Sequence, residues 1–225
     1  MTTRRVHQKD TASLTKILAE DILAQLKQAI AKNGAARLAV SGGSSPIPVF
    51  EYLSSQNLDW DKVKITLVDD RCVAETHPDS NALLAKTHLL KDRAADAEFI
   101  PLFCDDIAAT ELSLSQHFPS YDVVILGMGL DAHTASIFPQ AMERDLALAK
   151  DSKQRCLLTD PKTAKHMRIT QTLAQLLKTD FLAVHITGEE KWKVLEPILE
   201  KPANQFPISH FIHQDEAPIS VYYTA

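Results

Sequence analysis

Short, continuous apolar runs alternate along the chain with segments in which apolar residues recur at helical spacing. The runs that predict strands are 37–40, 63–68, 99–102, 123–126, 156–158, 181–186 and 219–223. The segments that predict helices are 11–33, 46–55, a helix capped by Ser80, 105–117, 170–177 and 189–200. Strands that are apolar on both faces are typical of a parallel sheet covered by helices. The sequence therefore predicts an α/β fold with a mostly parallel, doubly wound, Rossmann-like sheet and helices on both faces.

No linker rich in Gly, Ser or Pro divides the chain, and no segment repeats another. At 225 residues the chain is long enough for one large domain. The stretch 202–218 is rich in loop-forming residues but lies late in the sequence. We therefore expect a single α/β domain over residues 1–225, with a loop-rich excursion near its end.

The charge balance argues against two broad classes of partner. Lys and Arg number 24 against 29 Asp and Glu, which gives a net charge of −5. Such a balance does not favour electrostatic capture of nucleic acid or of an anionic membrane. The first residues, from Met1 to His7, are charged and are followed by a polar stretch rather than a long apolar one. We therefore expect a cytoplasmic protein that contacts neither nucleic acid nor a membrane.

The three cysteines, Cys72, Cys104 and Cys156, are odd in number and far apart in sequence. This pattern favours reduced thiols over a disulfide framework or a zinc site, and no metal site is predicted. Arg71 adjoins Cys72 and leaves open a nucleophilic thiolate there, with a simple filler role as the ordinary alternative.

The segment Ser41-Gly42-Gly43-Ser44-Ser45-Pro46 joins a predicted strand to a predicted helix. Glycines let the backbone approach a ligand closely, and the free amides at the start of a helix favour an anion. The segment therefore predicts a phosphate-binding turn in which Gly42, Gly43 and Ser44 contact the anion. An ordinary strand-to-helix turn has a similar sequence, so both interpretations stay open on these residues alone.

Two further strand ends carry candidate catalytic side chains. Asp69, Asp70 and Arg71 follow the run 63–68, and a glycine-rich segment with Asp131 and His133 follows the run 123–126. Ligands of open parallel sheets bind beyond the carboxyl ends of the strands. Histidine exchanges protons near neutral pH and a nearby carboxylate can orient it, so His133 is a candidate general base. The alternatives are a solvated loop with a local ion pair and a structural histidine.

Two cations come from other strand ends. Arg168 is expected at the start of the helix 170–177, and Lys191 follows the strand 181–186. Either alone would ordinarily be a solvent-facing cation. Together with the turn at 41–46 they would converge on one edge of the sheet, and such convergence indicates a site. The remaining histidines show no metal-ligand spacing, and His185, inside an apolar strand, is expected to be a core residue with its hydrogen bonds satisfied.

Several of these motifs, in this order, resemble those of the 6-phosphogluconolactonases, a family related to the glucosamine-6-phosphate deaminases. The resemblance covers nearly the whole chain. The matching segments are 41–46, 69–73 with Ser80-Asn81, 126–139, 168–170 and 188–191. Two positions depart from the family pattern, because Asp70 stands where the family usually has Glu and Ala132 stands where it usually has Gly.

The resemblance implies hydrolysis of 6-phosphogluconolactone to 6-phosphogluconate in the oxidative pentose phosphate pathway, with no metal or organic cofactor. It also implies that the substrate is a small sugar-phosphate lactone. The sequence does not distinguish a monomer from a small homo-oligomer. His133 would be the general base with Asp131 beside it, and Arg71 would face the lactone. The residues that would hold the substrate and its phosphate are Gly42, Gly43, Ser44, Asp69, Arg168 and Lys191.

Two other functions remain as alternatives. The first is an amino sugar phosphate isomerase or deaminase, but those relatives typically carry Tyr at the position of Arg71 and Glu at the position of Phe138. A phenyl ring cannot relay protons during sugar ring opening. The second is a sugar-phosphate sensor domain of a transcription regulator, which would normally add a basic helix-turn-helix segment.

Overall fold

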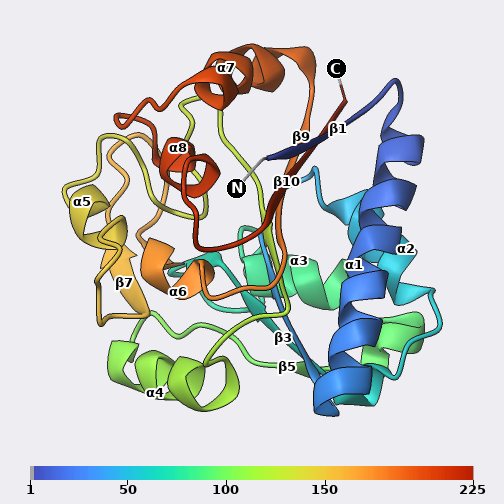
Figure 1. Cartoon of the computed structure of the whole chain (residues 1–225). Helices are drawn as coiled ribbons and strands as arrows, with labels where there is room; N and C mark the ends of the chain where they lie inside the picture. The colour runs from blue at the N-terminus through green and yellow to red at the C-terminus, as the bar shows by residue number, and fades with distance from the viewer. Residues whose placement is uncertain (1–2, 225) are drawn as a thin grey trace.

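A seven-stranded parallel sheet forms the centre of the computed structural model, which describes residues 3–224 (Figure 1). The strand order is β1-β10-β9-β6-β2-β3-β5, and every pair is parallel. The strands are β1 (Arg4–Gln8), β2 (Ala36–Val40), β3 (Val63–Leu67), β5 (Glu98–Phe99), β6 (Val123–Leu126), β9 (Leu182–Thr187) and β10 (Ile219–Thr224). The predicted α/β fold with a mostly parallel sheet is confirmed.

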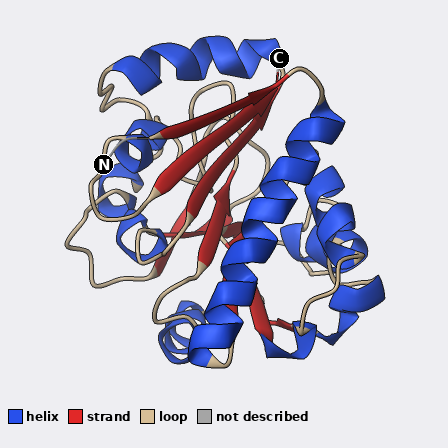
Figure 2. Cartoon of the chain, turned by 45° about the vertical axis from the view of Figure 1, so that its right-hand side comes forward, coloured by secondary structure: helices blue, strands red, loops and turns tan. Residues whose placement is uncertain are grey.

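Helices cover both faces of this sheet (Figures 1 and 2). The first three pack on one side and the later ones on the other. They are α1 (Thr11–Asn33), α2 (Ile47–Ser54), α3 (Asn81–His88), α4 (Ile107–His117), α5 (Arg144–Ala147), α6 (Leu173–Leu176), α7 (Glu189–Glu200) and α8 (Pro207–Ile212), with 3-10 helices at Trp60–Lys62 and Asp92–Asp96. None of the helices within residues 3–224 is both long and apolar enough to cross a membrane.

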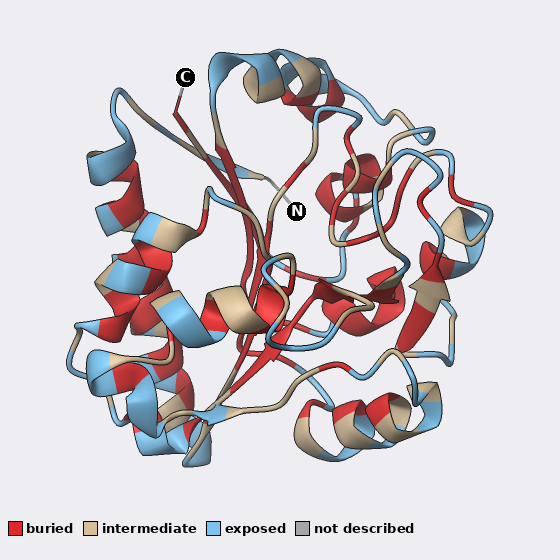
Figure 3. Ribbon diagram, turned by 180° about the vertical axis from the view of Figure 1, so that it is seen from behind, coloured by how far each residue is buried: buried red, intermediate tan, exposed pale blue. Residues whose placement is uncertain are grey.

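The helix α1 shows how the sequence specifies these elements. Asp10 caps its first turn by accepting a hydrogen bond from the Ser13 amide at 2.8 Å, and Gly34 ends it in the left-handed conformation. Leu14, Leu18 and their successors at the same spacing are fully buried against the sheet (Figure 3). Each such leucine stabilises the fold by about 1.5–3 kcal/mol relative to an exposed position.

A second, three-stranded sheet was not predicted. It is antiparallel, has the order β4-β8-β7, and contains β4 (Asp69–Arg71), β7 (Cys156–Thr159) and β8 (Arg168–Gln171). The expected loop after position 68 therefore begins with a strand, and the expected helix 170–177 is reduced to 173–176. Arg168 begins a strand rather than a helix. The predicted strand 156–158 corresponds to β7, whereas β4 and β8 are short and mostly polar, so only their pairing with distant segments defines them.

Two further elements, β1 and α8, were not predicted from the sequence. The edge strand β1 is polar and mostly exposed, and it pairs only with β10, so it lacks the apolar run by which the other strands were found. The helix α8 lies inside the stretch 202–218 that was expected to be loop, and it begins at Pro207, where a fixed backbone angle suits a first helical turn.

The prediction of three reduced cysteines is wrong for two of them. Cys72 and Cys104 form a disulfide, with their Cα atoms 5.4 Å apart, although 32 positions separate them in sequence. The segment that follows β4 and the segment that follows β5 meet at this bond. A nucleophilic thiolate at Cys72 is therefore excluded in this state. Cys156 is free and buried, and burial together with Glu111 raises the pKa of its thiol to about 12.

The strand order places the predicted functional segments side by side. The strands β9, β6, β2 and β3 are consecutive neighbours in the sheet. Lys191, the His133 loop, the glycine turn and Asp69 each follow the carboxyl end of one of them. From β2 the chain continues to β3 and β5 on one side, and then returns to form β6, β9 and β10 on the other side. The strand order therefore reverses between β2 and β6, and ligands of open parallel sheets bind at such a point.

Candidate active site

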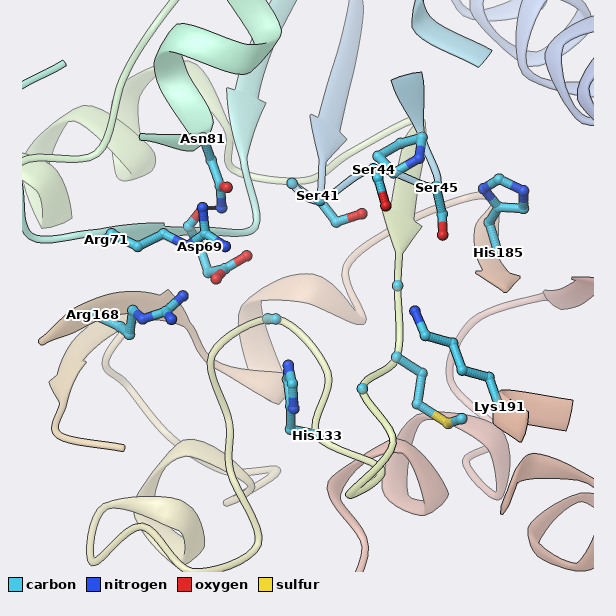
Figure 4. A pocket seen from close by; sticks show the side chains of 17 residues that line it. Ser41, Ser44, Ser45, Asp69, Arg71, Asn81, His133, Arg168, His185 and Lys191 are labelled. Atoms are coloured by element: carbon cyan, nitrogen blue, oxygen red, sulfur yellow. Dashed lines mark hydrogen bonds between the residues drawn. The ribbon is translucent and has the colours of Figure 1, made fainter. Parts of the chain in front are cut away.

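A cavity of about 250 Å³ opens at this edge of the sheet (Figure 4). The structure brings to it nearly all residues that the sequence singled out, and Asp131 contacts it through His133. The predicted residues in its lining are Gly42, Gly43, Ser44, Asp69, Arg71, His133, Arg168 and Lys191. Other lining residues include Ser41, Ser45, Asn81, Met128, Gly129 and His185.

The glycine turn gives the cavity one wall. A Cβ atom on Gly42 would lie 1.9 Å from Oδ1 of Asn81, so only glycine fits at this position. Asn81 is itself fixed, because its side-chain amide donates to the Asp69 carbonyl at 2.9 Å. At the other end of the turn, the hydroxyls of Ser45 and Thr187 lie 2.8 Å apart. These contacts hold the turn between the start of α3 and the end of β9, with its backbone facing the cavity.

His133 is held by its own loop. Its Nδ1 lies 2.5 Å from Oδ1 of Asp131, and the same oxygen accepts the His133 backbone amide at 3.2 Å. The ring stacks on Phe138 with centroids 4.3 Å apart. A Cβ on Gly129 would lie 2.2 Å from the imidazole, so glycine is required there for the ring to occupy this place. Because Asp131 engages Nδ1, the Nε2 atom is the one available to a ligand.

The Asp131 carboxylate is adapted to this contact. Burial raises its pKa, but the hydrogen bonds and positive charge of His133 outweigh that effect, so the pKa lies below its ordinary value. A carboxylate that stays ionised both orients an imidazole and stabilises its protonated form. The pair is therefore suited to general acid–base chemistry.

Ala132 occupies strained backbone between these two residues. Its φ is +61°, and its side chain is fully buried. Left-handed backbone costs a non-glycine residue about 1–2 kcal/mol. The loop keeps this conformation because the Ala132 amide donates to the Gly129 carbonyl at 3.0 Å and its carbonyl accepts the Ile208 amide at 3.2 Å. Thus alanine at the usual glycine position leaves the loop in the conformation that glycine favours.

The two aspartates after β3 have different structural roles. Asp69 lines the cavity and accepts a hydrogen bond from the Ser136 hydroxyl at 2.5 Å, which links β4 to the His133 loop. Asp70 faces away and accepts the backbone amides of Arg71, Asn81 and Ala82 at 2.6–3.0 Å. Burial raises the pKa of Asp70, and these amides oppose that effect. Asp70 therefore fixes the segment that carries Arg71.

Arg71 and Arg168 face each other across the pair β4 and β8, at directly opposed positions. Burial and then the charge of Arg71 lower the pKa of Arg168. The Arg71 guanidinium donates to the Asp79 carbonyl at 2.6 Å. Among the described residues neither arginine forms an ion pair with a carboxylate within 4.0 Å. Asp69, Asp70 and Asp79 offset part of the charge at Arg168, but two cations at directly opposed strand positions still repel each other.

Lys191 provides a cation at the opposite end of the cavity. It lies in the first turn of α7, next to the carboxyl end of β9, and its burial lowers the pKa of its amine. It too forms no ion pair with a carboxylate among residues 3–224. Arg71, Arg168 and Lys191 thus leave the cavity with unpaired positive charge on both sides of His133 (Figure 4).

Unsatisfied polar atoms concentrate at this cavity. In the described part of the chain six buried side-chain nitrogen or oxygen atoms lack a hydrogen-bond partner. Four of them belong to residues that line the cavity: Arg71 Nε, Arg168 Nε, Asn81 Oδ1 and His185 Nε2. Folded proteins leave few buried polar atoms unpaired, so the grouping of these atoms around one cavity indicates a binding site for a polar ligand.

His185 differs from the sequence expectation. It is buried as predicted, with 2% exposure, but its Nε2 has no partner and it lines the cavity. The interpretation of a satisfied core histidine is therefore wrong. The apolar residues around His185 in the sequence predicted a core position. Only the tertiary structure shows that β9 places this side chain against the cavity.

A cluster of His77, Asp79 and His166 offers three possible metal ligands within 4.8 Å of one another. The Asp79 carboxylate already binds His166 Nε2 at 2.9 Å and Lys165 at 3.2 Å, which lower its pKa to about 2. His77 Nδ1 accepts the Asp79 amide at 3.0 Å. These contacts within the cluster fix the segment whose carbonyl binds Arg71. The positions of His77, Asp79 and His166 in the sequence did not predict this grouping.

The fold and the cavity define an α/β protein with a cationic, histidine-containing site at the carboxyl edge of a parallel sheet. The family model of glucosamine-6-phosphate isomerases/6-phosphogluconolactonase matches residues 9–219. The chain belongs to this family.

Relatives and solved structures agree with this assignment. The chain is 37% identical over 226 residues to a 6-phosphogluconolactonase of Pseudomonas putida, covering 97% of this chain and 92% of the relative. It is 36% identical over 222 residues to that of Neisseria meningitidis, covering 96% of both. A crystal structure of a 6-phosphogluconolactonase from Shewanella baltica matches with a TM-score of 0.95 and 36% identity, over 99% of this chain and 98% of that one.

Proposed function

We propose that this protein hydrolyses 6-phosphogluconolactone to 6-phosphogluconate, a reaction of the oxidative pentose phosphate pathway. The observation that carries the proposal is the contact of His133 with Asp131, 2.5 Å apart, at a cavity with unpaired cations on both sides. The names of relatives that match nearly the full length of the chain support the same substrate. The proposal includes one domain, a monomer or small homo-oligomer, and a cytoplasmic location.

In the proposed reaction Asp131 holds the Nδ1–H side of His133, and Nε2 removes a proton from a water molecule. The water oxygen forms a bond to the lactone carbonyl carbon, and the carbonyl electron pair moves to its oxygen. Arg71 stabilises that negative oxygen. The carbonyl then re-forms, the bond to the ring oxygen breaks, and the imidazolium returns its proton to the departing ring oxygen. The products are a carboxylic acid and a hydroxyl on the opened chain.

The phosphate supplies the orientation. The backbone of Gly42 and Gly43, the Ser44 hydroxyl and the cations Lys191 and Arg168 would hold it, and Asp69 would accept a hydrogen bond from a sugar hydroxyl. A phosphate held by cations fixes the position of the carbonyl relative to His133, and such positioning lowers the entropic part of the barrier. No step in this mechanism uses a metal or an organic cofactor.

The stacking of Phe138 on His133 argues against the isomerase or deaminase alternative. The phenyl ring lies 4.3 Å from the imidazole and offers no group that could pass a proton to it. It provides an apolar surface instead, which keeps the imidazole in place without competing for its Nε2 atom.

One assay tests the proposal. Acid release from freshly made 6-phosphogluconolactone is followed with and without the protein, with the unphosphorylated lactone and glucosamine 6-phosphate as comparison substrates. We expect acceleration well above the spontaneous rate for the phosphorylated lactone, a much smaller effect on the unphosphorylated one, and no turnover of glucosamine 6-phosphate. An unaccelerated phosphorylated lactone would refute the proposal.

A further inference from the structure

His185 lies at the end of the cavity that holds Lys191 (Figure 4). It belongs to β9, two positions before Thr187. Side chains two apart on a strand point to the same face. Thr187 faces the glycine turn, because its hydroxyl lies 2.8 Å from that of Ser45. The His185 ring therefore faces the same turn, behind the residues already assigned to the phosphate.

The environment of His185 is not that of a packing residue. The ring is 2% exposed and its Nε2 has no hydrogen-bond partner, whereas the residues on either side of it in β9 are the apolar Val184 and Ile186. Leaving a buried polar atom unpaired costs about 1–3 kcal/mol. An aliphatic residue would fill the same position without that cost, so packing alone does not account for an imidazole here.

The protonation state of His185 decides what it can offer to a ligand. Burial and then the charge of Lys191 lower its pKa to about 4, so the ring is neutral at physiological pH. A neutral imidazole carries one N–H donor and one acceptor nitrogen. Among residues 3–224 neither ring nitrogen of His185 forms a hydrogen bond, but only Nε2 is among the fully buried unpaired atoms, so Nδ1 is the nitrogen that reaches the cavity. A buried N–H without an acceptor is rarer in proteins than a buried acceptor without a donor, so the proton belongs on Nδ1 and the buried Nε2 carries the lone pair.

We propose that His185 is a phosphate-binding residue of this site, whose neutral imidazole donates its Nδ1–H to a phosphate oxygen of the substrate beside Lys191. This inference rests on the proposed function. A second cation at this place would repel Lys191, and its burial would cost additional desolvation free energy. A neutral donor adds a hydrogen bond to the anion without burying another charge. His185 thus extends the phosphate subsite from the surface turn into the sheet itself.

The test compares His185→Leu, which removes the donor, with His185→Asn, which retains an N–H close to the position of Nδ1. Val184→Ala serves as the control, because it disturbs the same strand from its opposite face. The kcat and KM values of all variants are measured with the phosphorylated and the unphosphorylated lactone, and thermal melting reports whether each variant folds. His185→Phe replaces His185→Leu if the leucine variant does not fold.

We expect His185→Leu to raise KM for the phosphorylated lactone roughly 10- to 100-fold, the range for a lost hydrogen bond to a charged group. The kcat value and the turnover of the unphosphorylated lactone should change much less, and His185→Asn should recover most of the loss. An unchanged KM in a folded variant overturns the assignment. Equal losses on both substrates, as in Val184→Ala, also overturn it and identify a packing residue.

A binding measurement separates this inference from the proposed function. In wild-type protein with ¹⁵N-labelled histidine, saturation with inorganic phosphate should shift the Nδ1 resonance of His185, which is identified by its absence in His185→Asn. No turnover is needed for this experiment. A resonance that does not move at saturating phosphate overturns the role of His185 even if the lactone is hydrolysed. A shift without hydrolysis would refute only the proposed function.

Discussion

The two sides of the cavity are built in different ways. On the side of the main sheet, Lys191 is a single cation beside the neutral donors of the glycine turn, and long parallel strands carry both. On the other side, Arg71 and Arg168 oppose each other across two short antiparallel strands. The first arrangement has no second cation opposite Lys191, whereas the second sets two like charges against each other.

The arginine side therefore needs more support, and the structure provides it. Asp70 accepts three backbone amides around Arg71, and the Asp79 carbonyl binds the guanidinium. The disulfide of Cys72 begins directly after this arginine. The comparison shows that a site can take a glycine turn from the edge of a parallel sheet, whereas a pair of like charges requires a dedicated set of tertiary contacts.

His133 lies between the two sides, and its removal should have the largest effect. His133→Ala is expected to lower kcat for the phosphorylated lactone by about 10²- to 10⁴-fold, the usual contribution of a general base, with little change in KM. His88→Ala is the control, because this partly exposed histidine contacts Glu51 and does not line the cavity. A rate near that of wild type, above the spontaneous background, would remove His133 from the mechanism.

Loss of the disulfide should weaken the arginine side selectively. Cys72→Ser with Cys104→Ser is expected to lower the free energy of unfolding by about 2–4 kcal/mol, because the bond closes a loop spanning 32 positions. Denaturant melts with and without reductant measure this. Reductant should destabilise the wild type and leave the double variant unchanged. Equal stability of the oxidised wild type and the variant would show that the tether does not support this region.

Substitution of the three cations of the cavity should affect different kinetic constants. Arg168→Ala and Lys191→Ala are each expected to raise KM for the phosphorylated lactone about 10- to 100-fold. Arg71→Ala should chiefly lower kcat, because in the proposed mechanism Arg71 stabilises the negative oxygen that forms on the lactone. Lys193→Ala, two positions along α7 and paired with Glu189, is the matched control. If KM were unchanged in Arg168→Ala but raised in Lys191→Ala, the phosphate would belong to the main-sheet side alone.

Relief of backbone strain in the His133 loop should give the smallest effect. Ala132→Gly removes the cost of φ = +61° but adds freedom to the unfolded chain. We expect a net gain in unfolding free energy of at most about 1 kcal/mol, with kcat within roughly twofold of wild type. A loss of more than that amount in thermal or denaturant melts would show that the buried Ala132 methyl contributes more by packing than it costs in strain.

Much of the site was predictable because its signals are local. The glycine turn, the placement of Asp131 two residues before His133, and the apolar strands before them depend on neighbours within a few positions. The parallel fold then brings such segments to one edge of the sheet, as expected. The proximity of Asp131 to His133 follows from the same short spacing.

The sequence by itself determined the α/β architecture, the family resemblance and the identities of most cavity residues, because strand and helix periodicity and short motifs are properties of contiguous residues. Only the tertiary structure decided the opposition of Arg71 and Arg168, the Cys72–Cys104 bond and the unpaired nitrogen of His185. Each of these depends on the register or depth at which distant segments meet. That register is set by packing over the whole core, so no local pattern encodes it.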